Sequence, residues 1–254
     1  MSTKAAARNV HNGGKTVETD FDVMYRETGP NGYPVGCNDE GDLIEIVDDG
    51  AGIFAQVLFR GEQSIAAAFA ELSDRVWRDA HHKWLALIAT GEIRQTDEME
   101  MNFADVKIRL QELDERYGNG HPQNDFDHGM TLGKLQALLW LEGGEWGSID
   151  DLVREDDTPF FVRRSRGEVI KQQETLREKV WWNRHQNRLW NISIGKEEVR
   201  CERISAAANK SARRIEKKYG KKNLGWSDLE WGILNGQLSA LRWVLGEEWD
   251  MLDT

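Results

Sequence analysis

An internal repeat constrains the fold of this chain more than any other feature of its sequence. Shifting the 254-residue sequence by 103 positions aligns 22 residues that begin at Gly129 with 22 residues that begin at Gly232, and ten pairs are identical. In the earlier segment the identical residues are Gly129, Gly133, Leu135, Ala137, Leu138, Trp140, Gly143, Glu145, Trp146 and Asp150. Two copies of one folding unit explain this agreement better than chance does.

The repeat continues upstream in the same order. A shift of 104 aligns seven residues of the segment 72–91 with identical residues of 176–195, and a shift of 102 aligns Tyr117-Gly118 with Tyr219-Gly220. A weaker match at a shift of 106 extends the repeat towards the N-terminus. The sequence therefore predicts a first unit at residues 41–146 and a second at 147–254.

Each unit is expected to contain three helices. Apolar residues recur at helical spacing between Ile65 and Ile88, and the following Gly91 can end that helix. The second helix is predicted at about Phe103–Tyr117 in the first unit and at about Glu197–Tyr219 in the second, each stopped by a glycine.

The third helix of each unit has the clearest start signal. Ser227 with Glu230 forms a capping box, and Asn124 with Asp127 is the corresponding pair. Both helices keep two glycines four residues apart, on one face, although a glycine inside a helix costs up to about 1 kcal/mol relative to alanine. Close packing against another helix is the expected reason.

Residues 1–40 lie outside the repeat. Val17, Phe21 and Tyr25 belong to a stretch in which apolar and polar residues alternate, and Gly29-Pro-Asn-Gly32 is a strong turn signal. The predicted fold is therefore mainly α, with two tandem pseudo-symmetric three-helix units and a short N-terminal β-hairpin or irregular segment.

Composition restricts location and redox chemistry. A hydrophobic share of 39% with 11 Trp is typical of a globular chain. The sequence has no apolar stretch of the roughly 20 residues that a membrane span needs, and its first residues lack the apolar core of a signal peptide. Only Cys37 and Cys201 occur, too far apart in sequence for a zinc knuckle. These features predict a cytoplasmic protein without a disulfide framework.

Charge is spread unevenly along the chain. The total is −11, but residues 1–60, 61–150 and 151–254 carry −5, −9 and +3. The excess of positive charge lies around the second helix of the second unit, in Lys196, Arg200, Arg203, Lys210, Arg213, Arg214, Lys217, Lys218, Lys221 and Lys222. The matching end of the first unit is acidic, with Glu112, Asp114 and Glu115.

This reversal has three interpretations: a solvated face, an electrostatic match between the two units or between two molecules, or a small nucleic-acid footprint. The first two are favoured, because the basic stripe has no interleaved aromatic residues and the whole molecule repels phosphate. Arg213, Arg214, Lys217 and Lys218 on the basic side, and Glu112, Asp114 and Glu115 on the acidic side, are the candidate partner-binding residues, and a homodimer is one form of the match.

The histidines give weak metal-site candidates. His81 and His185 are shared by the two units, each four residues after a shared Trp, and two related units could bring them to one axis. His121 and His128 lie among Asp125 and Asp127. Structural interpretations are favoured for both sets, because no further ligand spacing accompanies the first pair and carboxylates at a helix start interact favourably with the helix dipole. No metal or other cofactor is predicted.

Two further features are also interpreted as structural. The shared tryptophans, such as Trp140 and Trp243, could line an aromatic pocket, but positions kept in both units are those that a core needs. The segment from Gly129 to Leu135 resembles a phosphate-binding loop, yet its spacer is one residue short and Leu135 replaces the magnesium-binding hydroxyl. No catalytic motif remains, so the sequence favours a non-enzymatic protein.

The last forty residues resemble the ending of small uncharacterised bacterial and bacteriophage proteins. The resemblance rests on Asn235-Gly-Gln-Leu-Ser-Ala-Leu-Arg-Trp-Val-Leu-Gly-Glu-Glu-Trp-Asp-Met-Leu-Asp-Thr254, preceded by Tyr219-Gly220 and Asp228-Leu-Glu-Trp-Gly232. It implies a phage or mobile-element setting, with the host cytoplasm or a virion as the location, and no activity.

The leading functional hypothesis is therefore a phage-encoded interaction protein that binds a protein partner through its duplicated helical surface, in anti-defence inhibition or virion assembly. The alternatives are an accessory protein that binds or mimics nucleic acid, and a metal-dependent enzyme that uses His81 with His185 or His121 with His128. The net charge disfavours nucleic acid and membranes as partners.

Overall fold

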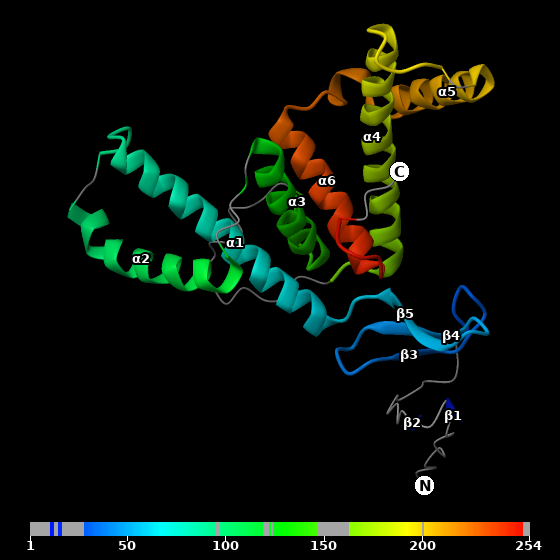
Figure 1. Cartoon of the computed structure of the whole chain (residues 1–254), viewed down its shortest axis with the longest axis horizontal. Coiled ribbons are helices and arrows are strands. Elements are labelled where there is room, and N and C mark those ends of the chain that lie inside the picture. Colours follow the sequence, from blue (N-terminus) through cyan, green and yellow to red (C-terminus); the bar gives the residue numbers. More distant parts are fainter. Residues whose placement is uncertain are drawn as a thin grey trace.

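The computed structural model describes residues 11–12, 15–16, 28–94, 97–118, 122, 124–146, 163–199 and 201–250, and the described part is mainly helical (Figure 1). Its helices are α1 (Glu62–Ala89), α2 (Asp97–Tyr117), α3 (Asp125–Leu141), α4 (Arg166–Ser193), α5 (Glu202–Tyr219), the 3-10 turn η2 (Lys221–Asn223) and α6 (Asp228–Val244). Its strands are β1 (His11–Asn12), β2 (Lys15–Thr16), β3 (Val35–Cys37), β4 (Leu43–Asp48) and β5 (Ile53–Phe59).

The last three strands form an antiparallel sheet in the order β3-β4-β5. Ile44 and Val47 are buried, and so is the carboxylate of Glu45, which accepts hydrogen bonds from the backbone N–H groups of Asn31 and Tyr33. The predicted turn at residues 29–32 is confirmed by a hydrogen bond between its end residues. The alternating stretch 17–25 lies outside the described residues.

Most of this sheet falls at residues 43–59, which the repeat match had placed in the first helical unit. That placement missed two strands. Ile44 and Glu45 are adjacent and both buried in β4, and only Leu58 is buried in β5, so burial in these two strands does not alternate with the period of two that marks a strand in a sequence.

Helices α3 and α6 form the centre of the molecule and run in parallel, since Gly129 faces Gly232 and Gly133 faces the turn that contains Gly236. A Cβ added to Gly133 would lie 2.8 Å from the carbonyl carbon of Ile233 and 2.9 Å from the backbone nitrogen of Gln237. The expected close packing at all four glycines is therefore confirmed.

The contacts between α3 and α6 are reciprocal. A Cβ on Gly129 would meet the carbonyl oxygen of Leu229, and a Cβ on Gly232 would meet that of Phe126. Beyond this contact, the backbone N–H of Arg60, before α1, donates to the carbonyl of Val244 in α6 at 2.8 Å. The backbone N–H of Arg164, before α4, donates to the carbonyl of Leu141 in α3 at 2.7 Å.

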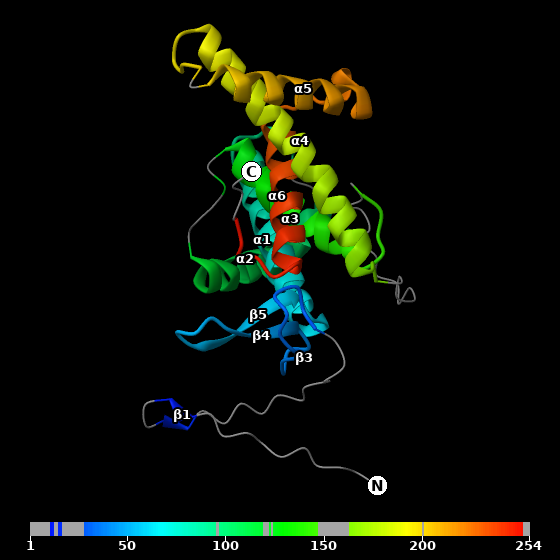
Figure 2. The same cartoon turned by 90° about the vertical axis from the view of Figure 1, so that its right-hand side faces the viewer.

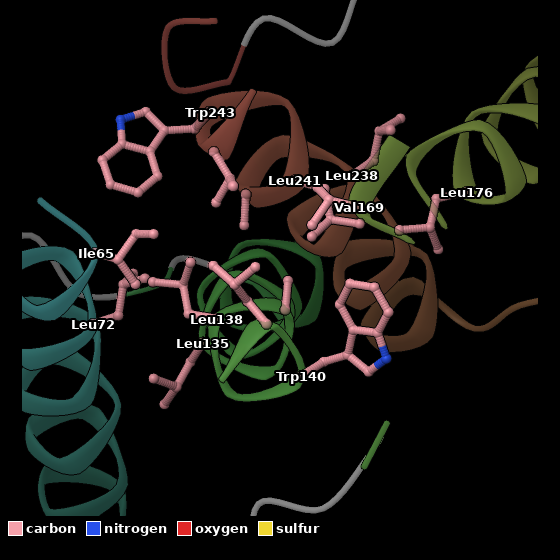
Figure 3. Close-up of a cluster of buried hydrophobic side chains, with 14 of the residues drawn as sticks. Ile65, Leu72, Leu135, Leu138, Trp140, Val169, Leu176, Leu238, Leu241 and Trp243 are labelled. Carbon is pink, nitrogen blue, oxygen red and sulfur yellow. The ribbon is translucent and has the colours of Figure 1, made fainter. Parts of the chain in front are cut away.

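One apolar core surrounds this centre. It joins residues of α3 and α6, such as Leu138 and Leu241, to Ile65 of α1 and Val169 of α4, as Figure 3 shows. Trp140 and Trp243 are 8% exposed at its edge, and they stack on Trp146 and Trp249 with ring centroids 5.0 and 4.5 Å apart. These shared tryptophans are thus core residues, as expected.

Two helix pairs extend from this core. We call α1 with α2 the first arm, and α4 with α5 and η2 the second arm. Helix α1 packs on α3 and α4 packs on α6, whereas α5 crosses the far end of α4 (Figure 1). The two views agree that α2 and α5 lie well apart (Figure 2). The arms therefore present separate surfaces.

The predicted helix starts are confirmed where a cap defines them. Ser227 accepts from the backbone N–H of Glu230 and forms the capping box, and Asn124 accepts from that of Asp127. Helix α2 begins earlier than predicted, at Asp97, and α5 begins later, at Glu202. Among the helices described, none is long and apolar enough to cross a membrane.

Candidate protein-binding surface

Helix α5 separates basic from apolar residues by its spacing. Arg203, Lys210 and Lys217 recur every seven residues, which is about two helical turns, so they share one face. Ala212 and Ile215, on the other face, are buried with Trp182, Leu224 and their neighbours. We define the basic surface as eight exposed residues of α5 and η2: Arg203, Lys210, Arg213, Arg214, Lys217, Lys218, Lys221 and Lys222.

Glu178 of α4 forms ion pairs with part of the basic surface. Its carboxylate lies 2.7 Å from Lys218 Nζ and 3.9 Å from a guanidinium nitrogen of Arg214, and it accepts a hydrogen bond from Tyr219. Partial burial opposes ionisation of Glu178, but the hydrogen bonds from Lys218 and Tyr219 outweigh it and lower the pKa of the carboxyl. The same hydrogen bond to Glu178 raises the pKa of Lys218.

Other residues of the basic surface lie further from the carboxylates that the structure describes. In the described part of the chain, Lys210, Arg213 and Lys217 are exposed and have no carboxylate within 4.0 Å. Between residues 166 and 223 the second arm has 16 basic and seven acidic residues, whereas residues 62–118 of the first arm have seven basic and 12 acidic ones. The second arm is therefore a strongly positive surface on a negative molecule.

The acidic candidates of the first arm differ from one another. Glu112 and Glu115 are exposed on α2, but Asp114 lies 2.9 Å from His82 and 3.9 Å from the buried guanidinium of Arg78. Arg78 is 1% exposed and also contacts Asp79 and the carbonyl of Gly118. Asp114 thus helps to neutralise a buried cation inside the arm. Sequence reasoning missed Arg78 because its partner at Gly118 is 40 residues away.

A cleft opens between α4 and α5 near their connection. Its volume is about 250 Å³, and its lining is mostly apolar, with His185, Arg188, Leu189, Ile192, Val199, Cys201, Ile204, Ser205 and Ala208. Val199 is 47% exposed and Ile204 is 63% exposed. Trp190, at 60%, lies on another side of α4, roughly 140° around the helix from His185, and Ile194, which follows the helix, is 45% exposed. Sequence reasoning missed the exposed apolar residues at this end of the second arm, because helical spacing alone does not show which apolar positions are left uncovered by other side chains.

The two shared histidines lie in separate arms. His81 Nδ1 lies 2.8 Å from the carbonyl oxygen of Trp77 in its own helix, and its ring stacks on Trp77. His185 Nε2 lies 2.9 Å from Oδ1 of Asn209, and its ring stacks on Trp181. Each is used within its own arm, and the structure does not bring them together in a shared ligand set.

The other metal candidates lie at the start of α3. Asp125 and Asp127 are in its first turn, where the Asn124 cap binds the backbone of Asp127, and His128 follows them. His121 lies outside the described residues. Over the ranges that the structure describes, no group of three or more His, Cys, Asp or Glu side chains could hold a metal ion.

The segment that resembles a phosphate loop lies inside α3. Gly129 and Gly133 face the backbone of α6, which leaves no room for a phosphate there. Lys134 Nζ instead lies 2.8 Å from the carboxylate of Asp250 and 5.1 Å from the ring centroid of Trp249. This lysine therefore anchors the segment after α6.

Comparison with known proteins found no match for this chain among family models, curated proteins or solved structures.

Proposed function

We propose that the chain is a duplicated interaction protein, with tandem three-helix units at residues 41–146 and 147–254. The sequence identities and the reciprocal contacts of α3 with α6 support the duplication. Matching hydrogen bonds in the two arms also support it. The hydroxyl of Tyr117 donates to Asp74 of α1 at 3.2 Å, and the hydroxyl of the corresponding Tyr219 donates to Glu178 of α4 at 2.7 Å. Residues that build the fold agree between the units, while the charges differ.

The proposed activity is binding of an acidic partner protein by the second arm. The observation that carries it is the basic surface of α5, exposed beside an apolar cleft, on a helix that contributes no residue to the apolar core around α3 and α6. Protein interfaces combine apolar contacts with charged residues that guide association. A basic surface that only faces solvent would explain the exposed charges, but it would not explain why the apolar side chains of Val199 and Ile204 are exposed beside them.

The same basic surface also favours a second candidate, contact with a nucleic-acid backbone. The acidic partner protein is preferred because the basic surface adjoins an apolar cleft with exposed Val199 and Ile204, and apolar contacts are typical of protein interfaces. We place the protein in a phage or mobile-element setting on the resemblance of its last forty residues. Non-enzymatic action, in anti-defence inhibition or virion assembly, is part of the same proposal.

A comparison of charge-reversal variants tests the proposal. The double variant Arg213→Glu with Lys217→Glu alters two exposed residues without a carboxylate partner among the described residues. Lys83→Glu with Lys171→Glu, at exposed sites on α1 and α4, changes the net charge equally and serves as the control. Each protein is immobilised and exposed to a lysate of the source organism, and the bound proteins are quantified by mass spectrometry.

The proposal predicts that the wild type and the control variant retain the same acidic proteins in equal amounts. The Arg213/Lys217 variant should retain at least about tenfold less of these proteins. Retention of every captured protein by that variant would refute it. Parallel titrations with duplex DNA and with RNA at several salt concentrations test the second candidate. The logarithm of a nucleic-acid binding constant should fall linearly with the logarithm of salt concentration. If the protein shows such binding and the Arg213/Lys217 variant weakens it, the proposed partner becomes a nucleic acid instead of a protein.

A further inference from the structure

The two arms differ at the positions where the cleft opens. In the first arm, Trp84 of α1 packs on Phe103 of α2 with ring centroids 5.7 Å apart. The shifts of 104 and 102 that align the two units place Arg188 and Ser205 at these positions in the second arm. Both residues line the cleft. In the first arm, two aromatic side chains thus occupy the region that corresponds to the open cleft of the second arm.

The remaining lining can accept an apolar group. Leu189 and Ile192 come from α4, Val199 from the connection, and Ile204 and Ala208 from α5. Covering the exposed parts of Val199 and Ile204 would remove apolar surface from water, which favours association. A large apolar side chain is the complementary occupant, because the corresponding pair in the first arm consists of a Trp and a Phe.

Positive charge lies on the α5 side of the opening, whereas the connection beside it and the first residue of α5 carry the exposed Glu197, Glu198 and Glu202. Arg188, in the lining, is 49% exposed and lies 3.6 Å from Glu197, while Arg203 is exposed one residue before Ile204. The basic surface continues along α5 through Lys210. A segment that left this cleft along α5 would therefore meet cations, which select carboxylates.

We propose that the cleft between α4 and α5 receives an aromatic side chain from an acidic segment of the partner protein, in the place that Trp84 and Phe103 fill in the first arm. This inference rests on the proposed function and adds its specificity. The basic surface supplies attraction for acidic proteins in general. The cleft selects those that carry an aromatic residue next to their carboxylates.

The two cysteines allow a test that needs no identified partner. Cys201 lines the cleft, whereas Cys37 is exposed on β3. The protein is equilibrated with the disulfides of 2-phenylethanethiol and of 2-mercaptoethanol in a thiol buffer, and the adducts at each cysteine are measured by peptide mass spectrometry. The ratio of aromatic to polar adduct at one cysteine cancels differences in thiol reactivity.

The inference predicts an aromatic-to-polar ratio at Cys201 about tenfold above that at Cys37, as expected for partial burial of a phenyl ring. Filling the cleft by Arg188→Trp with Ser205→Phe should remove this preference. Equal ratios at the two cysteines in the wild type, or a preference that the filled variant keeps, would overturn the inference. If the filled variant does not fold, Ile204→Asp at an exposed position replaces it and should lower the ratio several-fold.

The capture experiment separates this inference from the proposed function. Loss of partners through Arg213→Glu with Lys217→Glu, but not through the filled cleft, would leave the function standing and overturn the role of the cleft. Loss through both supports both.

Discussion

Replacing Gly133 by alanine tests the contact on which the whole arrangement depends. The new Cβ would lie 2.8 Å from the carbonyl carbon of Ile233 and 2.9 Å from the nitrogen of Gln237, and closer still to the carbonyl oxygen of Ile233. Carbon atoms pack best at about 3.5–4.0 Å, so the shortfall is roughly 1 Å. The obstacle is the backbone of α6, and no side chain can turn away to relieve it.

The expected cost follows from two opposing terms. Overpacking of this kind destabilises a protein by about 1–3 kcal/mol, and separation of two core helices belongs at the upper end. Alanine recovers up to about 1 kcal/mol of helix propensity. The net loss is therefore about 2 kcal/mol in the free energy of unfolding, which lowers Tm by roughly 4–8 °C in a chain of this size.

Gly167 provides the matched control, because it lies in the first turn of α4 and an added Cβ there meets nothing within 4 Å. Gly167→Ala should leave the stability unchanged or raise it by up to about 1 kcal/mol. Thermal unfolding followed by circular dichroism at 222 nm, with urea titration of the same proteins, measures both variants. If Gly133→Ala were as stable as Gly167→Ala, the parallel contact of α3 with α6 would be refuted.

Three further predictions concern other parts of the structure. Ser227→Ala removes the cap of α6 and should lower the free energy of unfolding by about 1 kcal/mol in urea titration, whereas Ser227→Asp should restore most of it. Arg78→Ala takes the buried cation away from the carboxylates of Asp79 and Asp114, of which Asp114 keeps His82, and should cost about 3 kcal/mol, the lower end for a broken buried ion pair; a loss under about 1 kcal/mol would contradict the role given to this ion pair. The pKa of Glu178 is lowered in the folded state, so the ionised carboxylate stabilises the folded protein. This contribution to the free energy of unfolding is present at pH values above the ordinary pKa of 4.5 and is lost as pH falls through the folded-state pKa. Wild type should thus exceed Glu178→Gln in stability at pH 7 and converge with it in acid, and a gap that stays constant with pH would exclude this linkage.

The sequence was sufficient where the chemistry is local. The cap of Ser227 with Glu230 lies within one turn, and the glycine pairs of α3 and α6 stand at a four-residue spacing that favours close contact with another helix. The basic surface could be predicted as well, because the spacing of Arg203, Lys210 and Lys217 depends on a single helix. In each case the residues that determine the feature are neighbours along the chain.

Features that depend on distant residues could not be predicted. The lining of the cleft comes from α4, from the connection and from α5, so it depends on how two helices and the segment between them pack. The burial of Arg78 depends on partners in another helix and beyond it. The strands at residues 43–59 were missed for a different reason: Glu45 is charged yet buried, so charge alone does not mark the solvent-facing side of β4.

The most direct test of the proposed function is whether a partner protein touches the second arm. A photo-crosslinking amino acid placed at position 213, on the basic surface, is compared with the same group at position 83, on α1, after exposure of each protein to the lysate. The proposed function predicts a crosslinked acidic protein from position 213 and none from position 83. Crosslinking of the same protein from position 83, with none from position 213, would contradict it.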